Sequence, residues 1–354
     1  MSTHETYIKR CLKIAKNGFG TTRPNPSVGA VIVHENKIIG EGFTSSFGGS
    51  HAEVNAIRAV KNKMLLKEAT MYVTLEPCSH FGKTPPCADL IVKHQLKQVV
   101  IGCLDTNSLV SGKGIECLKS ANIEVIVGVL EAACRIHHKR FFTVQEKKRP
   151  YIILKWAETK DGFVAPISKN ENKPIFISNA YSQQLVHKLR SKEHAILVGT
   201  NTALADNPKL NVRSWFGENP IRIVLDRTLR IPENANILDG SVQTIVFTEK
   251  INPEKETRKK KVNFKENLIF KKIDFSKKLA KQICSVLYKH NIQSLIVEGG
   301  TQTLQTFIAE NLWDEALVFV GDNSFKEGVK SPEIKRRYVQ EHIKKDVLKR
   351  FTND

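Results

Sequence analysis

The residues best suited to chemistry are a His-Ala-Glu triplet and two cysteines that each follow a proline. His51 and Glu53 stand at the head of a helical pattern, and Cys78 and Cys87 each begin a turn or helical segment. A helix N-terminus favours the thiolate, which is the form that binds a metal ion. One imidazole and two thiolates leave one tetrahedral position for water. The pattern therefore predicts one Zn²⁺ per chain, bound by His51, Cys78 and Cys87. Glu53 would be the catalytic carrier of a proton from water to a leaving amine.

The spacing departs from the usual zinc-deaminase signature. That signature is H-x-E followed by P-C-x-x-C, whereas eight residues separate Cys78 from Cys87 here. A longer loop still reaches the metal if it folds back, and Gly82, Pro85 and Pro86 supply residues typical of turns. Two alternatives stay open, namely two unrelated cysteines beside a capping histidine, and a closed structural zinc site.

The elements that must position these residues alternate along the first half. After a leading amphipathic helix, residues 27–43 form a hairpin pattern around a polar turn, and residues 51–62 are helical. Strands are predicted within 69–77, 98–104 and 123–129, with helices within 87–95 and 112–121 between them. This order predicts a layered α/β domain over residues 1–147. The basic stretch 140–150 is interpreted as a linker to a second domain over 148–354.

The second half also alternates between strands and helices. Strands are predicted at 151–158, 194–199, 221–226, 243–247 and 294–300, and helices at 180–190, 277–290 and 301–312. The basic segment near the C-terminus, 334–350, is interpreted as a surface helix. The apolar segment 315–321 is interpreted as an exposed edge, which favours a homo-oligomer.

Length, composition and charge exclude several classes of protein. A chain of 354 residues with 41% apolar and 26% charged residues is typical of two soluble globular domains. The N-terminus lacks the apolar stretch of a signal peptide, and an odd count of seven cysteines argues against a disulfide framework, so we expect a cytoplasmic protein outside the membrane. The net charge of +19 divides into +9 over residues 1–149 and +10 over the rest. This even spread favours a generic basic surface over a nucleic-acid footprint, and small anionic substrates such as phosphates would fit the charge equally well.

Four stretches resemble one particular family. "TTRPNPSVGAVIV", "SHAEVNAI", "YVTLEPCSHFGKTPPC" and "LDTNSLVSGKGI" are similar to the deaminase half of the bifunctional deaminase/reductase of riboflavin biosynthesis. The resemblance implies a cytidine-deaminase-like three-layer domain that deaminates 2,5-diamino-6-(5-phosphoribosylamino)pyrimidin-4-one. It also implies contacts to this small-molecule substrate from Asn25, His80, Lys83, Asp105 and Asn107.

The second half resembles the reductase half of the same family, on the stretches "LKWAETKDGF", "HAILVGTNTALADNPKLNVR", "PIRIVLD" and "SLIVEGGTQTLQTFIAENL". The resemblance implies a dihydrofolate-reductase-like α/β domain that reduces the ribosyl chain to ribityl with NADPH. Lys155 would polarise or protonate the sugar oxygen. Substrate contacts are implied for Arg190, Leu210, Arg213 and Glu298. Cofactor contacts are implied for Ala157, Phe176, Thr202, Asp206, Arg227, Gly300, Thr301, Gln302, Thr303, Leu304, Gln305 and Thr306.

Two positions depart from the family pattern. Pro174 and Phe176 replace a serine and a tryptophan, and Arg227 stands where a small polar residue is common. Arg227 would bind the 2′-phosphate of NADPH or be a plain surface residue. The competing hypothesis for the whole chain is a tRNA adenosine or cytidine deaminase with a basic accessory domain.

Overall fold

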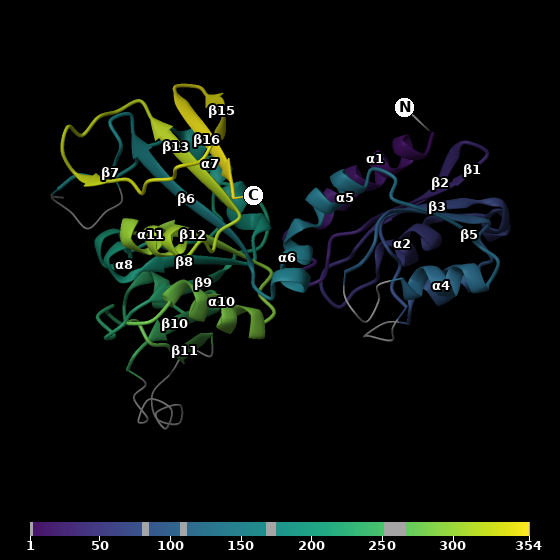
Figure 1. The fold of residues 1–354 in the computed structure, drawn as a ribbon, viewed down its shortest axis with the longest axis horizontal. Helices are drawn as coiled ribbons and strands as arrows, with labels where there is room; N and C mark the ends of the chain where they lie inside the picture. The colour runs from purple at the N-terminus through teal and green to yellow at the C-terminus, as the bar shows by residue number, and fades with distance from the viewer. Residues whose placement is uncertain (1–2, 80–84, 107–111, 168–174, 251–266, 354) are drawn as a thin grey trace. The chain divides into compact units, whose positions relative to one another are not determined.

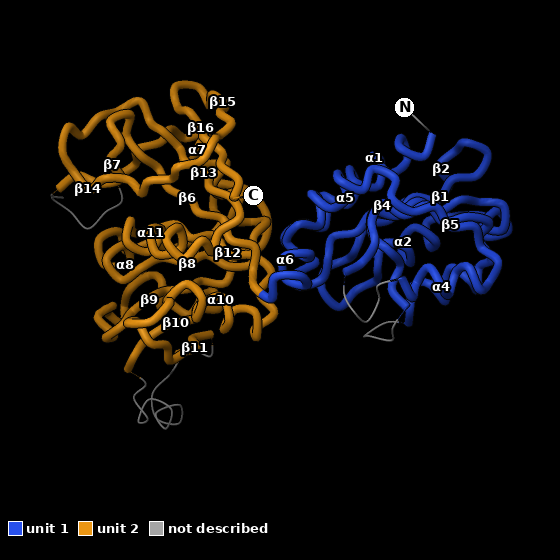
Figure 2. The backbone as a smooth tube through the Cα atoms, viewed as in Figure 1, with its two compact units in different colours: residues 1–148 blue, residues 149–354 orange. Residues whose placement is uncertain are grey.

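The computed structural model describes residues 3–79, 85–106, 112–167, 175–250 and 267–353. The chain divides into two compact units, residues 1–148 and residues 149–354 (Figure 2). No helix among the described residues is long and apolar enough to cross a membrane. Each unit is an α/β structure built on its own sheet, which confirms the predicted fold class.

The first unit contains a five-stranded sheet in the order β2-β1-β3-β4-β5. Its strands are β1 (Gly29–His34), β2 (Lys37–Phe43), β3 (Thr70–Leu75), β4 (Gln98–Cys103) and β5 (Glu124–Val127). The predicted hairpin is β1 and β2, which pair antiparallel. Its turn residues Glu35 and Asn36 both have positive φ, as a tight hairpin turn requires.

Helices cover both faces of this sheet and make a three-layer unit. They are α1 (Thr3–Ala15), α2 (Ala52–Ala59), α3 (Cys87–Lys93), α4 (Lys113–Ser120), α5 (Glu131–His137) and α6 (Lys139–Lys147), with short 3₁₀ helices η1 (Lys16–Gly18) and η2 (Lys63–Glu68). Helices α1 and α5 lie on one face, and α2 and α4 lie on the other (Figure 1). Gly42 lets α2 approach β2 closely, since a Cβ there would lie 2.4 Å from the Ala56 nitrogen.

The interpretation of residues 140–150 as a linker was wrong for most of that stretch. Residues 139–147 form α6, and its Phe141 and Phe142 are buried in the core of the first unit. Burial of two aromatic side chains stabilises a helix that its own weak periodicity did not reveal.

The second unit contains a nine-stranded sheet in the order β11-β10-β9-β8-β12-β6-β13-β16-β15. The strands of this unit are β6 (Tyr151–Thr159), β7 (Phe163–Ala165), β8 (Ala195–Gly199), β9 (Ile221–Leu225), β10 (Thr244–Thr248), β11 (Leu268–Lys272), β12 (Ser294–Gly299), β13 (Glu315–Gly321), β14 (Val329–Lys330), β15 (Tyr338–Ile343) and β16 (Asp346–Thr352). Strands β7 and β14 form a separate two-stranded sheet. The strands from β11 to β13 pair in parallel, so their carboxyl ends gather at one edge.

Two apolar cores cover the opposite faces of this sheet. The helices are α7 (Ala180–Lys192), α8 (Thr200–Asp206), α10 (Leu279–Lys289) and α11 (Thr301–Ala309), with the 3₁₀ helix η3 (Asn236–Leu238). One face packs Leu154 and Leu197 with residues of α10 and α11. The other face packs Ile153 and Ile296 with residues of α7 and α8.

Two sequence interpretations in this unit were wrong. The basic segment interpreted as a surface helix is the β15–β16 hairpin, in which Lys344 has positive φ and β16 pairs with β13. The segment 315–321 is not an edge, because β13 lies between β6 and β16 and its Phe319 is buried. Segment 315–321 therefore offers no free edge to a second chain.

Candidate active sites

Three predicted metal ligands converge at one end of the first sheet. His51 immediately precedes α2, Cys78 follows β3, and Cys87 is the first residue of α3. The His51 Nδ1 lies 3.3 Å from the Cys87 Sγ and 3.5 Å from the Cys78 Sγ. The Cys78 Sγ also accepts a hydrogen bond from the Cys87 backbone N–H. The eight-residue spacing therefore does bring both sulfurs to the same imidazole.

The donor set fits zinc. The three ligand atoms all lie within 4.8 Å of one another, and the cysteines are free thiols. Zinc bonds of about 2.3 Å to sulfur and about 2.0 Å to nitrogen, at a tetrahedral angle, place the two donors about 3.5 Å apart. Among the described residues, which do not include His80, no fourth ligand joins this cluster, and one histidine with two cysteines is a ligand set found at catalytic zinc sites.

Glu53 lies in the first turn of α2 with only 4% of its surface exposed. Burial raises its pKa to about 7, and the nearby Cys78 sulfur adds to the effect. The pKa of Cys78 is lowered to about 4, chiefly because its sulfur accepts a hydrogen bond from the Cys87 side chain. The cluster thus combines a carboxyl group that exchanges a proton near neutral pH with a stable thiolate.

Two of the five predicted substrate contacts of this unit, Asn25 and Asp105, lie among the described residues. Asp105 is buried just after β4, and β4 is the parallel neighbour of β3, the strand that leads to Cys78. Asn25 lies on the loop before β1, where its backbone N–H donates to the Thr22 carbonyl oxygen. His80, Lys83 and Asn107 lie outside the described residues.

In the second unit, Lys155, Glu298 and Arg190 form a largely buried charge cluster. Lys155 on β6 and Glu298 on β12 point to the same face of the sheet, and Arg190 comes from α7. The Arg190 Nη2 and Nε donate to the Glu298 carboxylate at 2.6 and 3.1 Å. Burial would raise the pKa of Glu298, but Arg190 and Lys155 outweigh it and lower that pKa to about 2. Burial lowers the pKa of Lys155 below its usual 10.5, which Glu298 partly opposes.

The second predicted arginine lies beside the first. Arg190 donates to the Asn211 carbonyl oxygen, and Arg213 donates to the Asn211 side chain, each at 3.3 Å. The Arg213 backbone N–H also donates to His187 on α7. Burial and the two arginines lower the pKa of His187 to about 4, so the imidazole is neutral. Leu210, at the start of this segment, is buried.

The predicted cofactor residues lie largely where two helices begin at the carboxyl edge of the sheet. The Gly300 N–H donates to the Thr202 Oγ1 at 2.8 Å, which ties the β12–α11 turn to α8. Gly300 has a φ of +32°, and a Cβ on Gly299 would lie 3.0 Å from Thr202. The run from Thr301 to Thr306 forms the first turns of α11. Backbone N–H groups at such a turn suit a phosphate.

The remaining predicted cofactor residues lie on several other parts of the second unit. Phe176 is 59% exposed. Ala157 lies on β6 and Asp206 ends α8. Arg227 follows β9 and forms an exposed ion pair with Glu249 at 2.8 Å.

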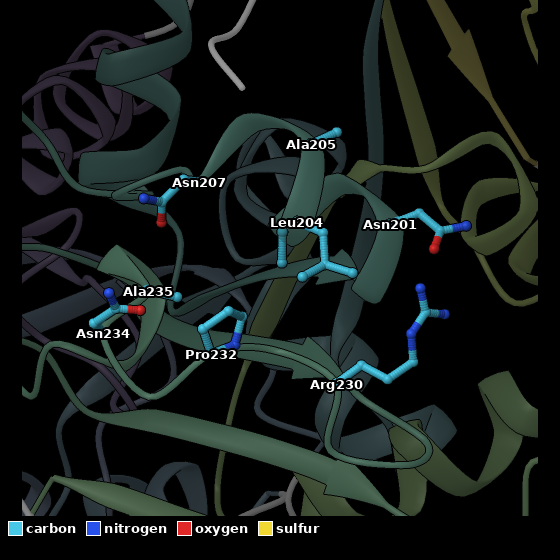
Figure 3. A pocket seen from close by; sticks show the side chains of 9 residues that line it. Asn201, Leu204, Ala205, Asn207, Arg230, Pro232, Asn234 and Ala235 are labelled. Atoms are coloured by element: carbon cyan, nitrogen blue, oxygen red, sulfur yellow. The ribbon is translucent and has the colours of Figure 1, made fainter. Parts of the chain in front are cut away.

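A pocket of about 530 Å³ lies against α8 and the loop 230–235 (Figure 3). Figure 3 shows the Arg230 guanidinium directed toward the Asn201 side chain. The lining comprises Asn201, Ala203, Leu204, Ala205, Asn207, Arg230, Pro232, Asn234 and Ala235. None of these is a residue that the sequence predicted to bind cofactor or substrate, although Asn201 adjoins Thr202.

Sequence reasoning missed several polar residues at these sites. Glu76 accepts backbone hydrogen bonds from the segment that carries Asp105, and its one signal is a position two residues before Cys78. His187 supports Arg213, which nothing in the local sequence indicates. Among the described residues, the buried hydroxyls of Ser79 and Thr106 have no hydrogen-bond partner.

Comparison with known proteins agrees with this geometry. Residues 1–103 match the family model of the cytidine and deoxycytidylate deaminase zinc-binding region. Residues 150–322 match the RibD C-terminal domain. The predicted zinc ligands all fall within the first match, and the Lys155 cluster falls within the second.

Relatives align with the chain along nearly its whole length. The riboflavin biosynthesis protein RibD of Aquifex aeolicus is 42% identical over 96% of this chain and 93% of its own. A crystal structure of a diaminohydroxyphosphoribosylaminopyrimidine deaminase/5-amino-6-(5-phosphoribosylamino)uracil reductase from Thermotoga maritima is 36% identical, with a TM-score of 0.86 over 99% of this chain and 98% of that one. RibD of Acinetobacter baumannii is 31% identical with a TM-score of 0.88 over the same shares. The chain therefore belongs to the RibD family of riboflavin biosynthesis proteins.

Proposed function

We propose that this chain catalyses two consecutive steps of riboflavin biosynthesis on a phosphoribosylated pyrimidine. The first is hydrolytic deamination of 2,5-diamino-6-(5-phosphoribosylamino)pyrimidin-4-one in residues 1–148. The second is reduction of the ribosyl chain to ribityl in residues 149–354. The observation that supports this most directly is the convergence of His51, Cys78 and Cys87 beside a buried Glu53.

In the first unit, His51, Cys78 and Cys87 would hold one zinc ion. Zinc bound there supplies Lewis-acid activation of a water molecule. Glu53 takes a proton from the attacking water and delivers it to the leaving amine, a role suited to a carboxyl group whose pKa is about 7. Asn25 and Asp105, with His80, Lys83 and Asn107, orient the pyrimidine and its phosphoribosyl group.

In the second unit, the N-termini of α8 and α11 would bind the cofactor, with Thr202 and Gly300 at the centre of the site. NADPH supplies the hydride. Lys155 donates a proton to the sugar oxygen as the ring opens, and Glu298 keeps that lysine charged until it reacts. Arg213 and Arg190 bind the substrate phosphate.

The competing nucleic-acid deaminase is less well supported. The relatives that align over the whole chain are RibD proteins, and the positive charge is divided evenly between the two halves. We place the protein in the cytoplasm, since its described cysteines are free thiols. A homo-oligomer remains a prediction. The segment 315–321, which suggested it, is an inner strand of the sheet and no longer supports it.

The deciding experiment compares wild type with Glu53→Gln in two assays on the full chain. We expect about one zinc per chain in both proteins, and ammonia release from the pyrimidine substrate only in wild type. The rate at which the deaminated product is reduced, measured as the loss of NADPH absorbance, should be equal in both proteins. Equal ammonia release by the variant, or protein purified without zinc, would show that the proposed deaminase chemistry is wrong.

A further inference from the structure

Glu76 connects the metal-binding segment to the segment after β4. Its side chain is only 3% exposed, directly before Pro77 and Cys78. The Glu76 Oε2 accepts hydrogen bonds from the backbone N–H groups of Asp105 at 3.3 Å and Gly112 at 3.1 Å. Its Oε1 accepts from the Gly114 N–H at 3.1 Å. One carboxylate therefore joins Asp105, just after β4, to Gly112 and Gly114 at the start of α4.

The start of α4 is shaped to reach this carboxylate. Gly112 has a φ of +81°, a conformation that favours glycine. A Cβ on Gly114 would lie 2.2 Å from the Pro77 carbonyl oxygen. The start of α4 therefore approaches the segment before Cys78 too closely for any side chain at position 114. In the part of the chain that the structure describes, the hydrogen bonds between the two segments are those that the Glu76 oxygens accept.

A carboxylate suits this place better than an amide of the same shape. Among the described residues, the three partners of Glu76 are all backbone N–H donors, and an ionised carboxylate offers only acceptors. A glutamine would direct its NH₂ at one or two of those donors. A buried N–H left without an acceptor costs more than the hydrogen bond contributed.

The described part of the segment held by Glu76 includes two polar residues that follow β4. Asp105 is a predicted substrate contact, and the next residue, Thr106, has a buried hydroxyl without a hydrogen-bond partner among the described residues. Ser79, on the metal-binding side, has a second such hydroxyl. Ser79 and Thr106 lie in the segments that follow the adjacent parallel strands β3 and β4.

We propose that Glu76 is a positioning residue for substrate binding in the deaminase unit, acting through the segment that carries Asp105 and Thr106. Within the described residues its hydrogen bonds go to backbone N–H groups and to no donor atom of a metal ligand, so its loss should misplace the substrate and leave the zinc site in place. This inference rests on the proposed deaminase function.

The test is Glu76→Gln in the full chain, with Asp226→Asn as the matched control. Asp226 is a buried carboxylate in the second unit that accepts the backbone N–H groups of Arg230 and Ile231. We expect Glu76→Gln to raise the deaminase KM by about tenfold, the size of one misplaced hydrogen bond. The kcat per bound zinc and the reductase activity should be kept. Asp226→Asn should leave the deaminase KM unchanged.

A second variant approaches the same contact from the other partner. Gly114→Ala keeps Glu76 but forces the start of α4 away from Pro77, so it should also raise KM with zinc retained. An unchanged KM in both variants, or loss of zinc and kcat with KM unchanged, would overturn the inference, as would unfolding of the first unit in both. Inactive wild-type protein would instead contradict the proposed function itself.

Discussion

The Glu298 carboxylate is the strongest candidate for a measurable electrostatic contribution to the stability of the second unit. Only 7% of its side chain is exposed, and Arg190 binds it through two nitrogens. Its pKa falls from 4.5 to about 2. Since one pKa unit corresponds to 1.36 kcal/mol, ionised Glu298 contributes about 3 kcal/mol at neutral pH. That value agrees with the cost of about 3–5 kcal/mol for breaking a buried ion pair.

We therefore predict that Glu298→Gln lowers the free energy of unfolding of the second unit by about 3 kcal/mol at pH 7. A carboxyl with a depressed folded-state pKa stabilises the fold above its unfolded pKa. The contribution is lost as pH falls through the folded value. The gap between variant and wild type should therefore be constant down to about pH 4.5 and shrink toward pH 2.

Urea unfolding followed by tryptophan fluorescence measures this directly. All three tryptophans, Trp156, Trp215 and Trp313, lie in residues 149–354, so the signal reports the second unit alone. Glu249→Gln is the control, because Glu249 pairs with the exposed Arg227 and such surface pairs contribute little. Equal unfolding midpoints for wild type and Glu298→Gln at pH 7, or a gap that does not shrink in acid, would refute the reasoning.

Three further predictions follow from individual residues. Cys87→Ser should lose zinc and deaminase activity while NADPH oxidation continues, as metal analysis and two separate assays would show; retained zinc would contradict the ligand assignment. Lys155→Met should abolish reduction without changing deamination, and the wild-type reductase rate should decline at a pH below that of an ordinary lysine, because burial lowers the pKa of Lys155. Burial lowers the pKa of His137 from 6.5 to about 4. The stabilisation that comes with the neutral imidazole is therefore fully present above pH 6.5 and is lost as pH falls toward 4. That loss amounts to up to about 3 kcal/mol in the free energy of unfolding of the first unit. Thermal unfolding by circular dichroism should show less acid sensitivity in His137→Gln, whose amide can still donate to the Ser27 carbonyl oxygen; equal acid sensitivity would assign the effect to other groups.

Local patterns in the sequence were sufficient to predict several features. Asn36 tolerates positive φ in a polar turn between two apolar runs, so the first hairpin depends on neighbours only. The His-Ala-Glu triplet and the two proline-flanked cysteines indicate the metal ligands, because few other roles require those residue types in that order. The alternation of strands and helices also predicts an α/β fold in both halves, since hydrophobic period is a local property.

Only the tertiary structure decided which segments became partners. The basic segment 334–350 resembles a surface helix by itself, but pairing with β13 and burial of Leu348 and Phe351 make residues 338–352 a hairpin. Phe141 and Phe142 likewise turn an apparent linker into α6. The contacts of Glu76 with Asp105 and of Arg190 with Glu298 join residues 29 and 108 positions apart. Strand pairing, side-chain burial and ion pairs join residues that are far apart in the sequence. Which of these contacts form therefore cannot be predicted from a short stretch of sequence alone.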